Sequence, residues 1–346
     1  MIEKKPTFLS LAVIIGLPIV ALLSSGLFYS PQNASVIDGS WSGQYEKNFD
    51  DNLSIHTLAI ASLGNVQYQI FGEGKKGVVI GSDGWLFTDE DFNLGTAEID
   101  NKLASIKTVA SQLKQKHIEL VVALIPDKSR IYAEHLGRYA RPNSLAMRYE
   151  NFRQTLIADG ISTPDILSAY EKQKSTTELF LKTDTHWTPA GARLAAQVVF
   201  GEAGAKLSDQ PKTQFKTELI SALSYSGDLT KFIPLGALQN LGPKPDQLIS
   251  EKTSESSSSS SLLDQGDVPI ALVGTSYSAI ETWNFSGALS NSFSLTIANE
   301  AKEGQGPMPP MYTYLASKDF TDHAPRMIIW EIPERYLPVP CVGQCD

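Results

Sequence analysis

Residues 183–191 read Thr-Asp-Thr-His-Trp-Thr-Pro-Ala-Gly, and this stretch is typical of a connection from a strand to a helix. Thr188 is a natural N-cap and Pro189 suits the first helical position, so a helix is predicted to begin here. Asp184 and His186 precede it two residues apart, which in an extended backbone puts both side chains on the same side of the chain. The carboxylate can then hold one imidazole nitrogen while the other faces a nucleophile. The stretch therefore predicts the orienting half of a Ser-His-Asp triad.

The nucleophile of such a triad is expected in a later segment of the chain. Residues 268–273 form a short apolar run typical of a buried strand, and residues 274–278 follow it as Gly-Thr-Ser-Tyr-Ser. Ser276 is predicted to lie on the turn at the carboxyl edge of this strand, where open α/β sheets place their sites. Ser278 and Thr275 are the alternative hydroxyl groups in the same turn.

Each of these three residues also has an ordinary structural interpretation. A serine hydroxyl needs a base held in the correct tautomer, and His186 is the one of five histidines with a carboxylate two positions before it. His186 could still be a structural or exposed histidine, and Asp184 could form an Asx turn. Ser276 could be a plain turn residue. The joint presence of all three favours the triad.

Strand-like and helix-like segments alternate along the chain. Strands are predicted at residues 77–80, 85–87, 118–125, 176–182, 269–273, 291–297 and 326–332, and helices at 99–113, 144–158 and 188–203. This alternation favours an α/β fold in which helices cover both faces of a parallel sheet. Residues 241–267 interrupt the pattern because Ser254 and residues 256–261, all serine, lie among charged residues and cannot bury apolar area. They are predicted to form a disordered Ser-rich insertion.

The N-terminus predicts export. Residues 8–29 carry no charge and follow Lys4 and Lys5, so their length suits a membrane span and the lysines favour a cytoplasmic N-terminus. Residues 1–29 are therefore interpreted as a signal anchor, with a cleaved signal peptide as the alternative. Residues 30–75 are predicted to form a helical spacer, and residues 76–346 the catalytic domain.

Composition excludes some classes of function. The chain has 346 residues, 42% of them hydrophobic, and a net charge of −9, so nucleic acid is not expected as a partner. Cys341 and Cys345 are its two cysteines. In an exported protein this short loop can close as a disulfide that staples only the tail. No further Cys or His lies nearby, and neither a metal site nor a cofactor is predicted.

These segments together resemble the alginate O-acetyltransferases of the AlgJ/AlgX type, an SGNH-hydrolase-like family. Ordinary SGNH esterases have the nucleophile block first and the histidine block last, whereas this chain has the reverse order, as that family does. The resemblance covers most of the chain between residues 35 and 337. Further landmarks that carry it are Gly81–Phe87, Pro126–Tyr132, Gly304–Pro307 and Trp330–Leu337.

The resemblance implies both a fold and an activity. The fold would be an SGNH-hydrolase-like parallel sheet flanked by helices, with the catalytic blocks rearranged. The activity would be O-acetylation of an exopolysaccharide, alginate or similar, in the periplasm. The acetyl donor would come from a membrane O-acyltransferase in the inner membrane. A secreted carbohydrate esterase with the same triad, or a non-catalytic polysaccharide-binding or scaffold subunit, are the alternatives.

Four residues are candidates for substrate contact. Trp187 could stack on a sugar ring, although a buried packing role is the alternative. Lys128, Arg130 and Tyr132 follow the carboxyl end of a predicted strand, where substrate contacts gather. They could hold a uronate or an acyl carbonyl, and a solvated loop is the alternative.

The oxyanion of acyl transfer needs donors that are in place before the reaction. The backbone N–H of Ser276 is the first candidate, and Asn284 is offered as the second. Tyr277, next to the nucleophile, is a further candidate contact. Three charged residues near the end, Glu331, Glu334 and Arg335, are expected to tie down the C-terminal edge of the domain.

Overall fold

The structure is a computed structural model, and it describes residues 29–31, 34–35, 39–52, 61, 63–256 and 268–341. The chain divides into two compact units. The N-terminal unit runs to Lys76 and includes Lys231–Lys244, which the sequence places in the catalytic domain; the sheet unit comprises Gly77–Thr230 and the chain from Pro245 onward. Of the predicted membrane segment, residues 8–29, residues 8–28 lie outside the described part of the chain. Among the described residues, no helix has the length and apolar character to cross a membrane.

The described parts of the N-terminal unit are mainly helical. They contain α2 (Ser40–Asn52), the π-helix η1 (Gln67–Phe71) and the 3-10 helix η7 (Gly236–Leu241). The side chain of Gln69 donates to the carbonyl of Leu241, and Gly64 lies so close to Pro234 that a side chain there would collide with it. These contacts join the two segments that make up this unit.

A four-stranded parallel sheet forms the centre of the sheet unit. Its strand order is β3-β10-β8-β9. β10 pairs with β3 along its whole length, from Met327 opposite Glu119 to Pro333 opposite Ile125. The four strands are β3 (Glu119–Ile125), β8 (Ile270–Val273), β9 (Ile297–Asn299) and β10 (Met327–Pro333). The predicted α/β fold with a parallel sheet is confirmed.

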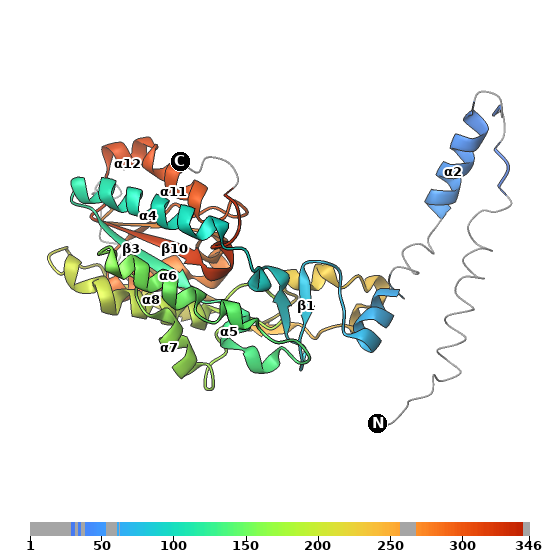
Figure 1. Cartoon of the computed structure of the whole chain (residues 1–346), viewed down its shortest axis with the longest axis horizontal. Helices are drawn as coiled ribbons and strands as arrows, with labels where there is room; N and C mark the ends of the chain where they lie inside the picture. The colour runs from blue at the N-terminus through green and yellow to red at the C-terminus, as the bar shows by residue number, and fades with distance from the viewer. Residues whose placement is uncertain are drawn as a thin grey trace. The chain divides into compact units, whose positions relative to one another are not determined.

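Helices cover both faces of this sheet. Alternate residues of a strand point to opposite faces, so Val121 and Ile329 enter one apolar core while Val122 and Trp330 enter the other. The first face is covered by α7 (Ile166–Gln173), α8 (Pro189–Ala203) and α10 (Phe285–Phe293); the second is covered by α4 (Ala97–Gln115), α6 (Arg148–Ala158), α11 (Met308–Leu315) and α12 (Lys318–Asp322). In Figure 1, α4, α11 and α12 lie on one side of β3 and β10, and α7 and α8 lie on the other.

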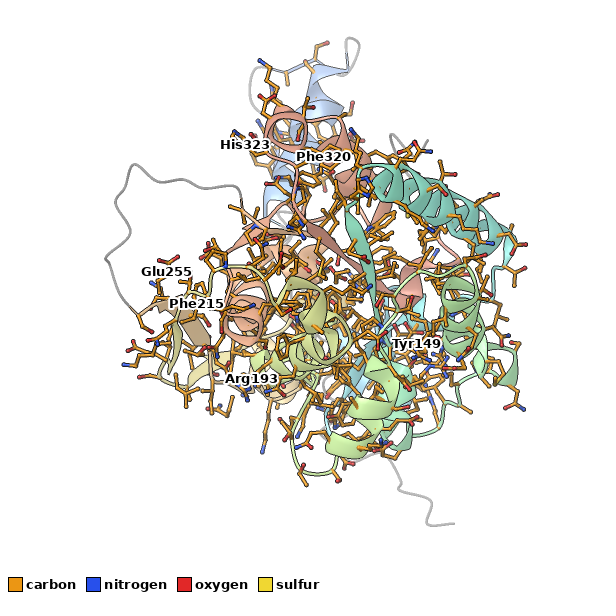
Figure 2. All side chains as sticks on the ribbon, turned by 90° about the vertical axis from the view of Figure 1, so that its left-hand side faces the viewer. Tyr149, Arg193, Phe215, Glu255, Phe320 and His323 are labelled. Atoms are coloured by element: carbon orange, nitrogen blue, oxygen red, sulfur yellow. The ribbon has the colours of Figure 1, made fainter. Side chains whose placement is uncertain are left out.

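Three small antiparallel pairs complete the strands: β1 (Val78–Ile80) with β2 (Leu86–Thr88), β4 (Phe215–Leu219) with β7 (Glu251–Glu255), and β5 (Leu223–Tyr225) with β6 (Asp246–Leu248). Phe215 pairs with Glu255 at the end of the β4–β7 ladder (Figure 2). The predicted disordered insertion, 241–267, is corrected in its first part, because β6 and β7 find ladder partners there. Residues 257–267 lie outside the described part of the chain.

Short helices fill the connections. They are α5 (Lys128–Ile131), α9 (Ser276–Ala279), and the 3-10 helices η2 (Asp89–Phe92), η3 (Ala133–His135), η4 (Asn143–Leu145), η5 (Gly204–Leu207), η6 (Asp228–Phe232), η8 (Glu281–Trp283) and η9 (Glu334–Tyr336).

Two strand predictions were wrong. Residues 291–297 alternate like a strand, but α10 continues to Phe293, and Ser294 then adopts a left-handed backbone. Residues 176–182 form a single bridge, Phe180 to Trp187, because the chain turns back at once. That turn carries the residues of the site.

Candidate active site

Ser276 lies directly after the central strand β8. Thr275 is the N-cap of α9, and its side chain accepts a hydrogen bond from the Tyr277 N–H at 3.3 Å. Gly274 precedes it in a position where a side chain would collide with the Glu331 carboxylate. The nucleophile turn is therefore tightly packed from below, while the Ser276 side chain itself remains partly exposed.

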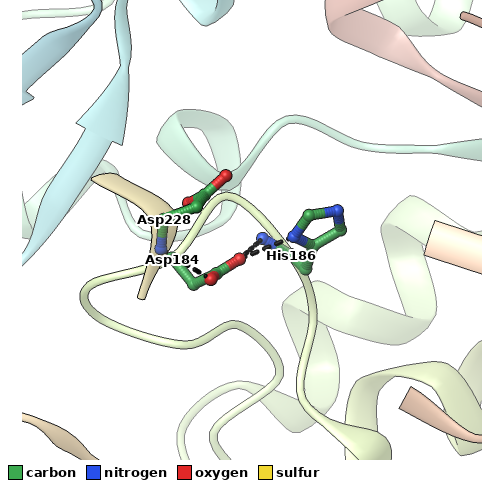
Figure 3. Close-up of side chains that lie close together, drawn as sticks. All are labelled: Asp184, His186 and Asp228. Carbon is green, nitrogen blue, oxygen red and sulfur yellow. Dashed lines mark hydrogen bonds and ion pairs between the residues drawn. The ribbon is translucent and has the colours of Figure 1, made fainter. Parts of the chain in front are cut away.

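The histidine and aspartate come from the tight turn between Phe180 and α8. His186 Nε2 lies 2.8 Å from Ser276 Oγ, and His186 Nδ1 lies 2.6 Å from Asp184 Oδ1. The backbone N–H of His186 donates to the same Asp184 oxygen at 2.9 Å. Figure 3 shows the two side chains joined in this way. The predicted pairing is present, but an Asx-type turn rather than an extended backbone brings the side chains together.

The second oxygen of Asp184 is also fully engaged. Asp184 Oδ2 accepts hydrogen bonds from the Tyr225 hydroxyl at 2.9 Å and from the Asp228 N–H at 2.8 Å. Burial raises the pKa of Asp184, but the hydrogen bond and charge of His186 and the Asp228 N–H lower it more, so this pKa lies well below its ordinary value. Asp184 is therefore a buried carboxylate that is permanently charged near neutral pH.

Asp228 was not identified from the sequence. Its carboxylate accepts from the Thr185 N–H at 2.8 Å and from the Thr185 hydroxyl, so it fixes the turn between Asp184 and His186. Gly227 packs so closely against the Thr183 backbone that only glycine fits there. The signal in the sequence was a turn of Gly and Asp after a strand, which says nothing about its partner in space.

Among the described residues, Asp184, His186 and Asp228 have ligand atoms within 4.8 Å of one another, a spacing at which they could hold a metal ion. Figure 3 shows this group. However, Asp184 already accepts four hydrogen bonds, and both nitrogens of His186 are engaged by Asp184 and Ser276. A metal would have to displace these contacts. The geometry therefore favours a proton-transfer triad over a metal site.

Aromatic rings enclose the imidazole. Trp283 stacks on His186 with ring centroids 5.2 Å apart and an interplanar angle of 23°, and the Tyr277 ring lies 4.8 Å away. Trp187, predicted as a sugar-stacking residue, is fully buried, and its indole N–H donates to the Tyr277 carbonyl at 3.2 Å. Trp187 is corrected to a packing residue of the turn.

Lys128, Arg130 and Tyr132, which were predicted to contact the substrate, use their polar groups to bind other parts of the protein. Lys128 is 3% exposed, and its ammonium donates to three backbone carbonyls, including that of Asp184 at 2.8 Å. Burial lowers the pKa of Lys128 to about 8 against the opposing effect of nearby carboxylates. Arg130 pairs with Glu334 at 2.6 Å, and the buried Tyr132 hydroxyl accepts from the Leu179 N–H. These residues therefore support the strand ends from inside.

Tyr277 and Asn284 are also held by protein partners. The buried Tyr277 hydroxyl donates to the Thr185 carbonyl at 2.6 Å and accepts from Arg335 at 2.7 Å. Asn284 has a left-handed backbone, and its amide donates to the Thr253 hydroxyl at 2.9 Å. Neither geometry directs the side chain to Ser276, so the second oxyanion donor is not assigned to Asn284.

Glu331 was expected to tie down the C-terminal edge of the domain. In the structure it lies beneath the nucleophile and binds residues on either side of it. Its carboxylate accepts from the Thr275 N–H at 2.7 Å, from the Thr275 hydroxyl and from the Ser278 hydroxyl at 3.0 Å. Complete burial raises the pKa of Glu331 to about 7, although these hydrogen bonds oppose the rise. Glu331 thus fixes both residues that flank the Ser276–Tyr277 pair.

The chain is similar to known proteins over most of its length. A family model described as SGNH hydrolase-like domain, acetyltransferase AlgX, matches residues 78–334. The probable alginate O-acetylase AlgJ of Pseudomonas syringae pv. tomato is 38% identical over 345 residues, 95% of this chain and 88% of that protein. The alginate biosynthesis protein AlgX of Pseudomonas aeruginosa is 30% identical over 276 residues, 75% of this chain and 56% of that protein. The solved O-acetyltransferase domain of Pseudomonas putida AlgJ has 39% identity and a TM-score of 0.71, covering 77% of this chain and 94% of that domain.

Proposed function

The chain belongs to the AlgX family of SGNH hydrolase-like acetyltransferases, and from this premise we propose that it transfers acetyl groups to hydroxyl groups of alginate. The resemblance inferred from the sequence is confirmed by these matches. The observation that carries the proposed mechanism is the continuous hydrogen-bonded series Ser276–His186–Asp184, with distances of 2.8 and 2.6 Å. Its partly exposed end is the serine.

The first half of the reaction forms an acetyl-enzyme. His186 Nε2 takes the hydroxyl proton of Ser276 while Oγ forms a bond to the acetyl carbonyl of the donor. The imidazolium is stabilised by Asp184, whose charge is fixed by four hydrogen bonds. As the tetrahedral intermediate collapses, the donor's leaving oxygen takes the proton from His186, and the acetyl group remains on Ser276.

The second half returns the enzyme to its starting state. A hydroxyl of the polysaccharide gives its proton to His186 Nε2 and attacks the acetyl carbon, and Ser276 Oγ leaves and takes the proton back. Water in place of the sugar would give hydrolysis by the same steps. Transferase and esterase therefore differ in the acceptor that reaches the acetyl-serine, and the membership in an acetyltransferase family supports the transferase.

The negative oxygen of each intermediate needs hydrogen-bond donors. Ser276 occupies the first position of α9, where a backbone N–H has no acceptor within the helix. This N–H is therefore the proposed first donor to the oxyanion. This N–H belongs to the same residue as the nucleophilic hydroxyl, and Glu331 holds the turn by accepting a hydrogen bond from the Thr275 N–H.

The proposed location is the periplasm, with an inner-membrane O-acyltransferase supplying the acetyl group. Two features support export: the uncharged segment at residues 8–29 after Lys4 and Lys5, and the disulfide bond of Cys341. Disulfides persist in oxidising compartments. The partner residue of Cys341 lies outside the described residues.

The test compares two serines that are two residues apart in the sequence and have different roles. Ser276→Ala should abolish both hydrolysis of a chromogenic acetyl ester and acetyl transfer to alginate oligomers. Ser278→Ala is the matched control, because it removes a buried hydroxyl that donates to Glu331 and leaves the nucleophile in place. Mass spectrometry should find the acetyl group on the peptide that contains Ser276. Full activity of Ser276→Ala would refute the mechanism, and ester hydrolysis without any transfer to alginate would favour the esterase.

A further inference from the structure

One cavity of the sheet unit is lined by segments that follow two contacts with the nucleophile turn. Lys302, in the loop after β9, donates its N–H to the Gly274 carbonyl at 3.1 Å, which ties this loop to the end of β8. Arg335, after β10, donates to the Tyr277 hydroxyl at 2.7 Å. The segments that continue from these two contacts contribute residues to the cavity wall. Residues that line it include Glu90, Lys102, Gly304, Gln305, Tyr336 and Val339.

The ammonium group of Lys102 is the unusual feature of this cavity. The residue is only 4% exposed, and among the described residues its one hydrogen-bond acceptor is the carbonyl of Val339. An ammonium has three N–H donors, so two of them have no acceptor among the residues that the structure describes. Burial lowers the pKa of Lys102, and the carboxylate of Glu98, four residues earlier on α4, opposes this shift. A buried ammonium that is incompletely paired is costly unless a ligand or water completes its shell.

The carboxylate in the cavity wall already has an ion-pair partner. The carboxylate of Glu90 lies 3.1 Å from Arg335 Nε, and so does not compensate Lys102. The half-buried ring of Tyr336 contributes an aromatic surface, and the Arg335 guanidinium lies 4.9 Å from the centre of that ring. Gln305 is exposed and adds an amide that can donate or accept hydrogen bonds.

We propose that this cavity is an acceptor subsite that binds the carboxylate of one uronate residue of the polysaccharide through Lys102. A buried ammonium suits an anionic oxygen, an aromatic ring suits the apolar face of a pyranose, and an amide suits sugar hydroxyls. The contacts of Lys302 and Arg335 connect the cavity wall to the nucleophile turn, and on this proposal the bound residue precedes or follows the acetylated sugar in the polymer. The inference rests on the proposed function, because it names how the same site selects its acceptor.

Two variants of the full chain test the subsite through different atoms. Lys102→Met should raise the KM for an oligomannuronate acceptor about tenfold or more, since a charge-assisted hydrogen bond is lost. Gln305→Glu should also raise this KM, because it places a negative charge in the cavity without altering a buried group. Gln115→Glu, at the exposed end of α4, is the matched control and should leave the KM unchanged.

The same variants should keep the wild-type rate of chromogenic ester hydrolysis without acceptor, and wild-type KM for a neutral oligosaccharide acceptor. An unchanged KM for oligomannuronate in both variants would overturn the subsite and leave the proposed function intact. If the wild type hydrolyses the ester but transfers nothing, the proposed function fails. The subsite is then tested by calorimetric binding of oligomannuronate to Ser276→Ala with and without Lys102→Met, where equal affinities would overturn it.

Discussion

Two buried polar clusters occupy the same edge of the sheet, and they differ in what their charges face. The first is centred on Glu334, directly after β10, which is fully buried. Its carboxylate contacts the side chains of Arg130 at 2.6 Å, Arg141 at 2.8 Å and Arg148 at 3.3 Å. Asp127, after β3, pairs with Arg148 at 2.7 Å. Every partner in this cluster is another part of the chain.

The second cluster is the triad. Asp184 is as deeply buried as Glu334 and also accepts several hydrogen bonds, but its partner His186 is in turn hydrogen-bonded to Ser276. The serine is partly exposed, and its hydroxyl is the one group of the series that reaches solvent. Burial and charge are therefore common to structural and catalytic clusters. What distinguishes the catalytic one is a reactive atom at an open end.

The largest effect expected from this comparison concerns Asp184. Asp184→Asn should leave the structure nearly unchanged and lower turnover by roughly 10³–10⁴, because His186 loses the group that holds its tautomer. His186→Ala should cost a similar factor, and the double variant should be little worse, since residues that act as a unit have non-additive effects. Steady-state ester hydrolysis measures all three.

The control is Asp228→Asn. The backbone N–H that binds Asp184 remains in this variant, so the fall in turnover should be much smaller. Additive losses in the Asp184 and His186 double variant would show that the two residues do not work together.

The Glu334 cluster should respond in the opposite way. Arg148→Met removes one arginine partner from each of two buried carboxylates, Glu334 and Asp127, and should lower the free energy of unfolding by about 3–5 kcal/mol. Turnover per folded molecule should remain near the wild-type value, because Glu334 and Asp127 pair with arginines and not with a residue of the triad. Chemical denaturation and ester hydrolysis on the same samples separate the two quantities.

Arg326→Met is the matched control for this variant. Arg326 and its partner Asp209 are exposed, and surface pairs contribute less than about 1 kcal/mol. Loss of turnover in Arg148→Met with unchanged stability would move the Glu334 cluster into the active site.

The sequence predicts one of these clusters and misreads the other, for a physical reason. Asp184 and His186 are two residues apart, and their link to Ser276 follows from a motif at a strand end. Arg130 and Glu334 are separated by 204 positions, and only the pairing of β3 with β10 brings them together. The sequence thus shows that a charged residue lies at a strand end, but it does not show which residue pairs with it in space.

The same limit applies to the fold. β3, β8 and β10 were predictable because buried parallel strands are continuous apolar runs, and α8 was predictable because Thr188 caps it, accepting from the Gly191 N–H at 3.0 Å. A strand was predicted at 291–297 because the apolar residues Phe293, Leu295 and Ile297 alternate with polar ones. The prediction failed because the packing of α10 keeps the chain helical to Phe293. Local pattern gave way to tertiary contact.

A third prediction concerns Glu331, which lies beneath the nucleophile and whose titration should change the stability of the fold. Its pKa rises from an ordinary 4.5 to about 7 in the fold. The folded state therefore holds a proton that the unfolded chain has lost between these pH values. The resulting stabilisation is complete below pH 4.5 and is lost as the pH rises to about 7, a change of about 3 kcal/mol.

Glu331→Gln isolates this effect, because glutamine retains an acceptor for Thr275 and Ser278 and does not titrate. The unfolding free energy of the wild type minus that of the variant should decrease between pH 4.5 and 7 and stay constant above. A difference that does not change with pH would mean that Glu331 is charged throughout.

The smallest expected effect concerns the hydrogen bond that Tyr225 donates to Asp184 from β5. Burial and the charge of Asp184 raise the pKa of Tyr225, so its hydroxyl stays protonated and available as a donor. Tyr225→Phe removes one of four hydrogen bonds to a carboxylate that keeps the other three, and a single bond is worth about 0.5–1.5 kcal/mol. Turnover should therefore fall about threefold to tenfold with little change in KM. Tyr139→Phe is the control, since its hydroxyl contacts the exposed Arg138. A loss as large as that of Asp184→Asn would make Tyr225 an equal member of the triad cluster.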